Sequence, residues 1–370
     1  MKNSFGNNLT VTLFGESHGP FIGAVLDGIA PGIKIDEDFI KAQLLLRRPV
    51  GKISTERVEE DPFQIVSGVF EGYTTGTALC ILIPNSVQHS RDYKATCDLA
   101  RPGHADYTAQ CKYHGFQDYR GGGHFSGRIT AALVAAAAIV LPALNQKNIF
   151  IGTHIKSCAG IEDSAFTQNN ADTLLSQIHQ LKKKQFAVLD EEKASLMISA
   201  IEAARNDSDS VGGVLETAVA GLPAGLGEPW FDSVESMLSH SLFSIPAVKG
   251  VQFGDGFDMV NGRGSSFNDS FRMQDGRVVT ETNHNGGING GITNGMPVVF
   301  RCAVKPTPSI YKTQQTVDFV KNENAELQIQ GRHDPAIIHR ARVVVDSVAA
   351  LTFYDMLSGR FGTDFFAGKR

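Results

Sequence analysis

The stretch D-Y-R-G-G-G-H-F-S-G-R at residues 118–128, followed by the alanine-rich run 131–138, decides how this chain is organised. The alanines have the highest intrinsic helix propensity in the chain and predict a buried helix. Three consecutive glycines before this helix let the backbone approach a ligand closely, and free N–H groups at a helix start attract anions. A glycine cap before a buried helix would explain the same residues. The dense polar content before an apolar helix favours an anion site.

Two further polar clusters lie upstream of this stretch. The sequence R-P-G-H-A-D-Y at 101–107 places a cation, a proton-transfer group and a carboxylate close together, in Arg101, His104 and Asp106. Nearer the N-terminus, the strand predicted over 9–14 runs into G-E-S-H-G at 15–19. A Ser-His pair between glycines after a strand is presented rather than packed. A polar turn with a capping serine is the alternative.

Two adjacent arginines end the helix predicted over 37–48, for which Asp36 is a suitable N-cap. Cations at a helix C-terminus complement the helix dipole. Arg47 and Arg48 cannot both do so on one face, so we expect one of them to reach a ligand.

Composition excludes several classes of protein. The chain has 370 residues, a net charge of -5 and 20% charged residues, which argues against a general nucleic-acid binder. No apolar run reaches ~18 residues, and the N-terminus lacks the apolar segment of a secretory signal. We therefore expect a cytoplasmic protein without membrane or nucleic-acid partners.

The cysteines indicate a reduced compartment and no metal. They are odd in number and form no C-x-x-C pair. Cys111 and His114 could begin a zinc site with Cys97 and His104, but no second close-spaced pair completes it.

The rest of the sequence predicts strands and amphipathic helices, with a long surface excursion over 261–277. The predicted strands are 9–14, 21–26, 149–155, 214–219 and 298–304, with a hairpin over 65–84. The predicted helices are 171–182, 190–204, 231–242 and about 348–357.

Two pairs of similar turns suggest an internal duplication. G-I-A-P-G-I at 28–33 resembles G-L-P-A-G-L at 221–226, and G-Y-T-T-G at 72–76 resembles G-I-T-N-G at 291–295. Chance similarity among glycine turns is the alternative. We predict one domain over residues 1–370, with α+β copies at roughly 9–145 and 210–358 that pack around a pseudo-twofold axis.

Seven motifs in order identify a family resemblance that runs from Phe14 to about Leu357. The chain resembles the chorismate synthases. The motifs are G-E-S-H-G (15–19), R-P-G-H-A-D-Y (101–107), D-Y-R-G-G-G (118–123), G-D-G-F (254–257), G-G-I-N-G-G-I (286–292), K-P-T (305–307) and R-H-D-P (332–335).

The resemblance implies a fold and an activity. The fold would be a β-α-β sandwich with helices between two antiparallel sheets, assembled as a homotetramer. The activity would be that of a lyase of the shikimate pathway and aromatic amino-acid biosynthesis. It converts 5-enolpyruvylshikimate 3-phosphate to chorismate by a 1,4-anti elimination that requires reduced FMN.

The resemblance also assigns roles to residues. His18 would be the general acid for the leaving phosphate, His104 would assist protonation of the flavin, and Asp334 would manage the proton at the flavin N5. For Asp334, a simple ion pair with an arginine is the alternative. The substrate-binding positions would be Ser17, Arg47, Arg48, Lys52, Arg101 and Arg128. The FMN-binding positions would be His124, Phe125, Ser126, Pro246, Ala247, Gly290, Lys305, Pro306, Thr307, Pro308, Ser309 and Arg332.

Some positions depart from bacterial relatives, several of which have Arg-Ser in place of His124-Phe125 and Asn in place of Pro246. A backbone contact would survive these changes, whereas a side-chain contact would not. The chain also shows no dinucleotide-binding fingerprint. NADPH is therefore expected to act only indirectly, through an external flavin reductant. A histidine-dependent phosphatase or phosphomutase, or a phosphate-binding protein, is the alternative, and neither would need flavin.

Overall fold

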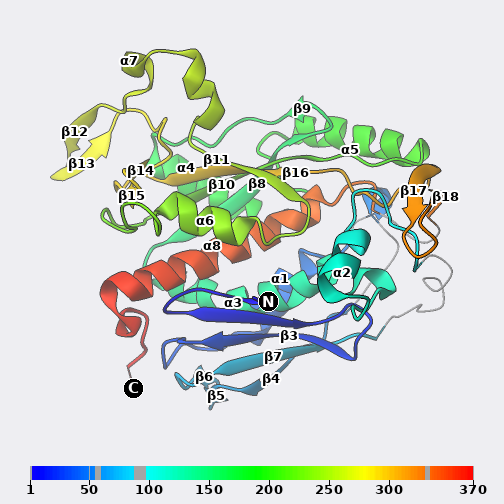
Figure 1. The fold of residues 1–370 in the computed structure, drawn as a ribbon. Helices are drawn as coiled ribbons and strands as arrows, with labels where there is room; N and C mark the ends of the chain where they lie inside the picture. The colour runs from blue at the N-terminus through cyan, green and yellow to red at the C-terminus, as the bar shows by residue number, and fades with distance from the viewer. Residues whose placement is uncertain (1, 50, 55–59, 87–96, 330–333, 370) are drawn as a thin grey trace.

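Two antiparallel sheets enclose a layer of helices in the computed structural model, which describes residues 2–49, 51–54, 60–86, 97–329 and 334–369 (Figure 1). This is the α+β sandwich that the sequence predicts. The first sheet has the order β1-β2-β3-β7-β4, formed by Ser4–Phe5 (β1), Thr10–Gly15 (β2), Phe21–Asp27 (β3), Leu79–Pro84 (β7) and Gln64–Ser67 (β4). The second has the order β11-β16-β10-β8-β9, formed by Val248–Phe253 (β11), Val298–Val304 (β16), Gly213–Ala220 (β10), Phe150–Cys158 (β8) and Ile161–Glu162 (β9).

The middle layer is built around two long helices that pack against each other, Thr130–Gln146 (α3) and Ile338–Phe361 (α8). The alanine-rich helix α3 is buried on nearly every side, because small side chains let its neighbours approach closely. The segment Gly127–Gln146 is long and apolar enough to cross a membrane by composition. However, 78% of its most apolar window is buried inside the protein, which makes it a core helix. Two shorter helices complete the layer, Glu37–Leu45 (α1) and Val234–Leu242 (α6).

The two sheets repeat one strand order. The strands β2, β3, β7 and β4 are neighbours in this order in the first sheet. Their counterparts β8, β10, β16 and β11 are neighbours in the same order in the second sheet. The turns that suggested a duplication also share their hydrogen bonds. Thr74 Oγ1 accepts from the backbone N–H of Ile33 at 2.9 Å, and Thr293 Oγ1 accepts from that of Leu226 at 2.9 Å. Each hydroxyl also donates to a carbonyl of the same turn, at 2.7 and 2.6 Å.

This correspondence bears on the boundaries of the two copies. The counterpart of β2 in the second sheet is β8, which begins at Phe150. We propose one domain in which the second copy begins near residue 148, with 159–212 inserted, instead of at about 210.

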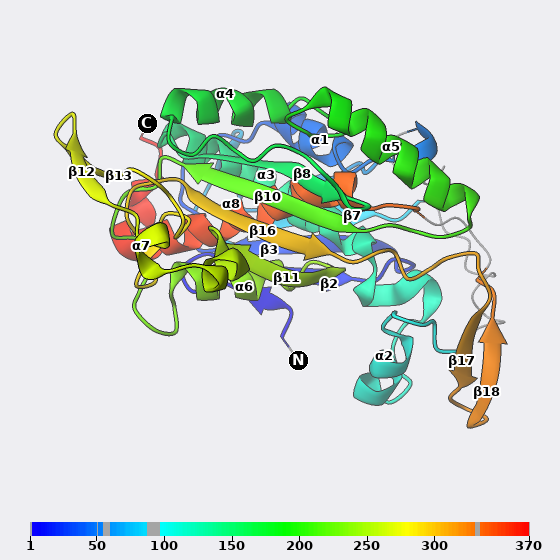
Figure 2. The same ribbon diagram turned by 90° about the horizontal axis from the view of Figure 1, so that it is seen from above.

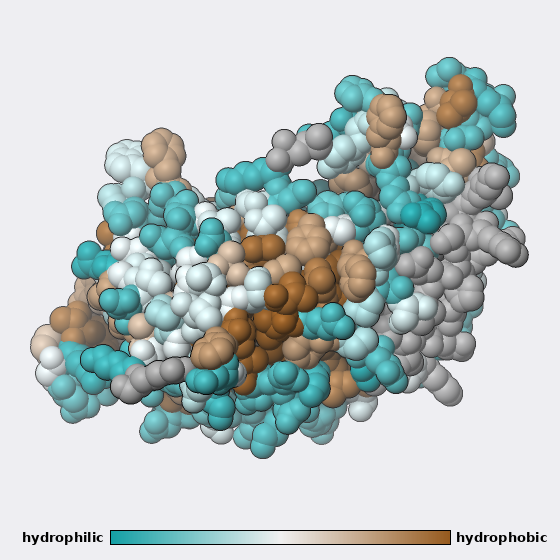
Figure 3. All heavy atoms as spheres, turned by 90° about the horizontal axis from the view of Figure 1, so that it is seen from below, coloured by the Kyte–Doolittle hydropathy of each residue, from teal (hydrophilic) through white to brown (hydrophobic). Residues whose placement is uncertain are grey.

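The two sheets differ on their outer faces. The inserted helices Ala171–Leu181 (α4) and Glu191–Asn206 (α5) lie along the second sheet (Figure 2). Helix α4 covers β8 and β10 with a second apolar cluster that includes Leu174, Ile178 and Ala218. No described helix covers the outer face of the first sheet, and Figure 3 shows an apolar patch on that side of the molecule.

Several predicted elements differ in extent. The final helix begins at Ile338, ten residues before the predicted start, because buried charged residues interrupt its apolar pattern. Helix α6 begins at Val234 and not at 231, because Ser233 caps it by accepting from the N–H of Ser236. A helix over Asp106–Tyr113 (α2) was not predicted.

Short elements complete the description. The excursion holds Gly264–Phe267 (α7) and the hairpin Phe271–Gln274 (β12) with Arg277–Thr280 (β13), which projects from the body in Figure 2. The other small hairpins are Val69–Phe70 (β5) with Tyr73–Thr74 (β6), Ile288–Asn289 (β14) with Ile292–Thr293 (β15), and Gln314–Asp318 (β17) with Glu323–Leu327 (β18).

The last helix ties down the beginning of the first sheet. The carboxylate of Asp355, on α8, accepts hydrogen bonds from the backbone N–H groups of Asn7, Asn8 and Leu9 at 2.5 to 3.1 Å. Because the Asp355 side chain is buried, these bonds fix where β2 starts.

Candidate active site

A cavity of about 1250 Å³ lies where four helix ends meet. The residues that follow α1 and α6 line it, and so do the residues at the starts of α3 and α8. Such a volume accommodates a cofactor and a small substrate together. Most of the residues that the sequence singled out gather here.

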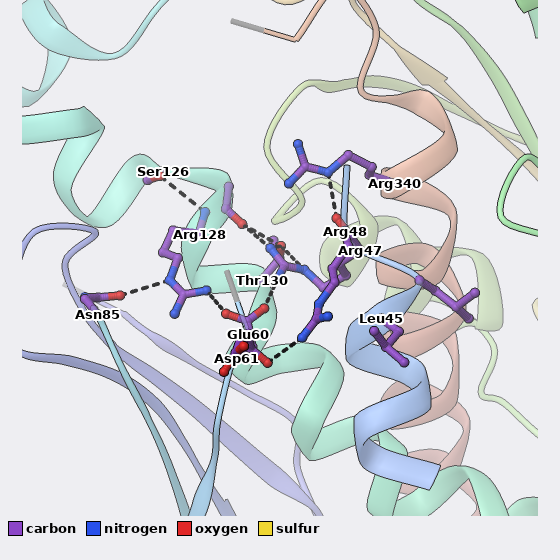
Figure 4. A network of polar contacts seen from close by, with 12 residues as sticks. Leu45, Arg47, Arg48, Glu60, Asp61, Asn85, Ser126, Arg128, Thr130 and Arg340 are labelled. Carbon is purple, nitrogen blue, oxygen red and sulfur yellow. Dashed lines mark hydrogen bonds and ion pairs between the residues drawn. The ribbon is translucent and has the colours of Figure 1, made fainter. Parts of the chain in front are cut away.

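Two of the predicted substrate-binding arginines converge on one carboxylate. Arg47 Nη1 lies 3.4 Å from Asp61 Oδ2, and Arg128 Nη1 forms a short contact with Asp61 Oδ1 (Figure 4). All three side chains are at least nine-tenths buried, and all three line the cavity. The arrangement therefore places two guanidinium groups and one carboxylate at the cavity wall.

Neutral groups fix the orientation of both arginines. Arg47 donates to Thr130 Oγ1 at 3.0 and 3.2 Å and to the carbonyl of Gly127 at 3.1 Å. Arg128 donates to Asn85 Oδ1 at 2.9 Å and to the carbonyl of Pro84 at 3.1 Å. The neighbouring Arg48 also lines the cavity, and its buried Nε has no hydrogen-bond partner among the described residues.

The glycine turn brings His18 next to the cavity. Gly121, with a φ of 61°, lies so close to the His18 ring that a Cβ there would be 2.2 Å from Cε1. Only glycine tolerates both the contact and the backbone conformation. His18 Nδ1 lies 3.2 Å from Ser17 Oγ, which donates to the carbonyl of Arg120 at 3.2 Å. His18 and Ser17 are buried one layer behind Gly121 and are not among the lining residues.

Asp106 holds the other histidine and a third arginine at the opposite side of the turn. Its carboxylate accepts from Arg101 Nε at 2.7 Å and Nη2 at 2.6 Å, and lies 2.9 Å from His104 Nδ1. Burial by itself would raise the pKa of Asp106, but the hydrogen bonds from Arg101 and His104 lower that pKa well below its usual range. The ionised Asp106 therefore orients His104, whose Nε2 faces Gly122 at the cavity.

The segments at the opposite wall come from the second copy. Ala247 adopts a left-handed conformation with a φ of 74°, and its carbonyl accepts from the N–H of Lys305 at 3.0 Å. Lys305 Nζ donates to the carbonyl of Gly103 at 2.5 Å. Thr307 Oγ1 is buried and has no hydrogen-bond partner in the described part of the chain. The cavity lining includes Pro246, Ala247, Lys305, Thr307, Pro308 and Ser309, whereas Pro306 is not part of it.

His124, Phe125 and Ser126 line the cavity between the glycine turn and α3. His124 Nδ1 donates to the carbonyl of Gly15 at 2.8 Å, which anchors the imidazole to β2. Ser126 Oγ accepts from the N–H of Arg128 at 3.2 Å and thereby caps the helical turn before α3. The ring of Phe125 is 38% exposed toward the open space.

Asp334 forms an ion pair with an arginine that sequence reasoning did not single out. Its Oδ2 lies 2.6 Å from Arg340 Nη1, and Arg340 Nε donates to the carbonyl of Arg47 at 2.6 Å. Both residues line the cavity. The contact joins the start of α8 to the end of α1, so the two copies are tied together at the site.

Comparison with known proteins now decides the family. The chorismate synthase family model matches residues 9–358. The chain belongs to the chorismate synthase family. It is 44% identical over 352 residues to the chorismate synthase of Pyrococcus abyssi, covering 95% of this chain and 96% of that protein. It is 43% identical over 357 residues to that of Lachnoclostridium phytofermentans, covering 96% of this chain and 95% of that protein.

A solved structure gives the same result at the level of the fold. A crystal structure of chorismate synthase matches with a TM-score of 0.77 at 27% sequence identity, covering 96% of this chain and 94% of that one.

Of the positions expected from the chorismate synthase family, Ser17, His18, Pro306 and Gly290 do not line the cavity, and the side chains of Lys52 and Arg332 lie outside the described residues. Gly290 lies in the β14–β15 hairpin, beside the start of α6, whereas the cavity is at the other end of that helix. Arg332 lies outside the described residues. The backbone of Lys52 belongs to a short 3-10 turn over Gly51–Ile53, and its side chain is outside the description.

Sequence reasoning missed Asp61, Asn85 and Arg340. Asp61 and Arg340 lie beside segments without a clear periodic pattern of apolar residues, so the local sequence did not indicate that they belong to the site. Asn85 comes directly after an apolar strand, which is where exposed functional side chains are often presented. That position was the one available clue.

Proposed function

We propose that this chain converts 5-enolpyruvylshikimate 3-phosphate to chorismate by 1,4-anti elimination of phosphate, with reduced FMN as cofactor. The convergence of Arg47 and Arg128 on one anion position, in a cavity of about 1250 Å³ that His104 also lines, carries the proposal. A phosphate and two carboxylates on the substrate call for such cations, since guanidinium groups bind both in bidentate fashion.

The residues of the cavity fit a flavin. The unpartnered Thr307 hydroxyl, the Lys305 ammonium group and the ring of Phe125 supply a hydrogen bond, a positive charge and an apolar contact. We therefore assign the FMN to 124–126, 246–247 and 305–309, and keep Gly290 and Arg332 as expectations from the family. Reduced FMN, when bound, supplies electron density to the substrate and takes up the hydrogen from C6.

Each protein group then has a defined task. The arginines bind the phosphate and the carboxylates, and their fixed neutral partners keep them oriented. His18, directly behind Gly121, is kept as the general acid for the leaving phosphate, the role that the family assigns to this position. His104, held at Nδ1 by Asp106, would hold or move a proton at Nε2, which faces the cavity. Asp334, paired with Arg340, would take up a proton at its carboxylate, the role that the family assigns to it.

A phosphohistidine mechanism, as in a phosphatase or phosphomutase, is less well supported. It leaves the glycine- and asparagine-rich stretch at 283–295 and the ordered set of seven motifs without a role. Family membership also argues against it.

An anaerobic assay tests the proposal. Purified protein with reduced FMN and enolpyruvylshikimate phosphate should release phosphate and chorismate in equal amounts. Fluorescence titration should also show that the substrate tightens FMN binding, because both share one cavity. Absence of chorismate with folded protein would refute the function.

The source of electrons and the assembly belong to the same proposal. We expect a cytoplasmic enzyme that depends on an external reductant, so NADPH with oxidised FMN should give no turnover until dithionite is added anaerobically. We also expect a homotetramer in which the bare outer face of the first sheet contacts another copy. This face carries Phe14, Val25 and Leu82 opposite the buried Ile22 and Ala24. Light scattering should give about four times the 39.9 kDa of one chain.

A further inference from the structure

Asp61 occupies the position between Arg47 and Arg128 that an anionic group of a ligand would take. Each of its two oxygens contacts a different guanidinium group, as two oxygens of a phosphate would (Figure 4). The Asp61 side chain is only 4% exposed, yet it forms part of the cavity wall. The carboxylate and an incoming anion therefore compete for the same N–H groups.

The two arginines do not depend on Asp61 for their orientation. Arg47 remains bonded to Thr130 and the carbonyl of Gly127, and Arg128 to Asn85 and the carbonyl of Pro84. All of these partners are uncharged. If the carboxylate leaves, these hydrogen bonds hold the guanidinium groups in the same direction, and the N–H groups that faced Asp61 can bind another anion.

The backbone at Asp61 is suited to such a movement. Asp61 has a φ of 48°, in the left-handed region that non-glycine residues rarely adopt. Residues 60–63 belong to no helix or strand, and β4 begins only at Gln64. The segment can therefore shift without breaking a sheet.

We propose that Asp61 is a displaceable counter-anion, which pairs with Arg47 and Arg128 before the substrate binds and is replaced by the phosphate group of the substrate. The proposal rests on the proposed function for the identity of the ligand. An alkyl phosphate carries about two negative charges near pH 7, against one for a carboxylate. Phosphate esters therefore displace Asp61, whereas a ligand carrying only a carboxylate gains little by exchange.

Calorimetry with inorganic phosphate, without flavin, tests the displacement. Asp61→Asn removes the competing charge and should bind phosphate about tenfold or more tightly than the unchanged protein, the equivalent of one charge-assisted contact. Glu60→Gln removes the same charge one residue earlier, from an exposed side chain, and should leave the affinity unchanged. Combining Asp61→Asn with Arg128→Gln should abolish the gain.

The opposite result has a clear meaning. If Asp61 were a permanent structural partner, folded Asp61→Asn would bind phosphate equally or more weakly, and the proposal would be wrong. Shikimate 3-phosphate and shikimate separate the two anionic groups: only the phosphate ester should gain affinity in Asp61→Asn. An equal gain for shikimate would show that the site receives a carboxylate, which would overturn the phosphate assignment.

A second measurement needs no variant and covers the case in which Asp61→Asn fails to fold. In the unchanged protein, hydrogen exchange at the amides of 60–63 should speed up when phosphate is added. Unchanged or slower exchange would contradict displacement. Neither experiment measures turnover. If the protein makes chorismate but shows neither the gain in phosphate affinity nor the faster exchange, only the role of Asp61 is wrong. If the protein shows both effects but makes no chorismate, only the proposed function is wrong.

Discussion

The helices α1 and α6 end with the same backbone hydrogen bonds but are followed by different side chains. After α1 come Arg47, Arg48 and Pro49, and after α6 come Ser244, Ile245 and Pro246. The backbone hydrogen bonds coincide: the N–H groups of 47 and 48 donate to 44 and 45 at 3.1 and 3.0 Å, and those of 244 and 245 donate to 241 and 242 at 3.1 and 3.1 Å.

The backbone is therefore shared between the two copies, whereas the side chains that face the cavity differ. The duplicated backbone delivers two helix ends to one cavity, and the side chains at those ends decide what each wall does. At these two helix ends the first copy supplies Arg47 and Arg48, whereas the second supplies the neutral residues 244–247. The same backbone turn therefore carries cationic side chains at the end of α1 and neutral ones at the end of α6.

The largest expected effect is on turnover and concerns His104, in the first copy. His104→Ala should lower turnover by about 10²- to 10⁴-fold while the protein stays folded, because a general acid–base group is lost. Single-turnover kinetics at saturating substrate, with circular dichroism as the folding check, measures this. Near-normal turnover would remove His104 from the mechanism.

A histidine in the second copy should show the reverse behaviour. His154, on β8, is fully buried and lies 2.9 Å from Asp163 and 3.0 Å from Glu216. His154→Gln leaves two buried carboxylates without their shared cation and should destabilise the fold by about 3–5 kcal/mol. Urea unfolding measures the loss, and His179→Ala, at an exposed position on α4, is the control.

The same triad gives stability a pH dependence. Burial lowers the pKa of His154, but the hydrogen bonds that His154 donates to Asp163 and Glu216 outweigh it and raise that pKa above 6.5. Its contribution is full below about 6.5 and is lost as the pH rises through the raised value. Burial raises the pKa values of Asp163 and Glu216, but hydrogen bonds from His154 lower them overall.

These two carboxylates therefore contribute fully above their ordinary pKa values of about 4, and lose that contribution as the pH falls through the lowered ones. The free energy of unfolding of the unchanged protein, minus that of His154→Gln, should be largest between about pH 4.5 and 6.5. A difference that increases steadily toward pH 9 would contradict the assignment.

The smallest effect tests the frame itself. Thr74→Val and Thr293→Val each remove a buried hydroxyl that serves one donor and one acceptor in its turn. Each should cost about 1–3 kcal/mol, and the two losses should agree closely because the hydrogen bonds are the same. Thermal unfolding compares them, with the exposed Thr77→Val as control. Clearly unequal losses would show that the two turns are not equivalent.

Local chemistry in the sequence predicts the frame well. Asp36 caps α1 as expected, accepting from the N–H of Phe39 at 2.9 Å, and the alanine run forms the central helix α3. The similar glycine turns predict a duplication that the strand orders match. These features succeed because short-range rules govern caps, periodicity and turns.

Long-range charge pairing could not be predicted in the same way. Asp61 meets Arg47 and Arg128 only after the first sheet and α3 have packed, and no spacing in the sequence encodes that meeting. The start of α8 was missed because Arg342 and Asp346 look like surface residues. In the fold they are buried and lie 3.5 Å apart on successive turns. Tertiary partners decide such positions, so a local pattern gives the wrong answer.

The hydrogen bonds between Asp355 and the backbone of residues 7–9 have a consequence for folding during translation. The first sheet leaves the ribosome early, and α3, which packs on its inner face, follows soon after, yet the helix whose Asp355 fixes the start of β2 follows roughly 300 residues later. At about 5–20 residues per second, that interval is on the order of 15–60 s. During this time the backbone N–H groups of residues 7–9 lack the Asp355 carboxylate that they bind in the fold, and contacts of such long sequence separation form slowly. Nascent chains that stall before residue 338 should therefore depend most on chaperones.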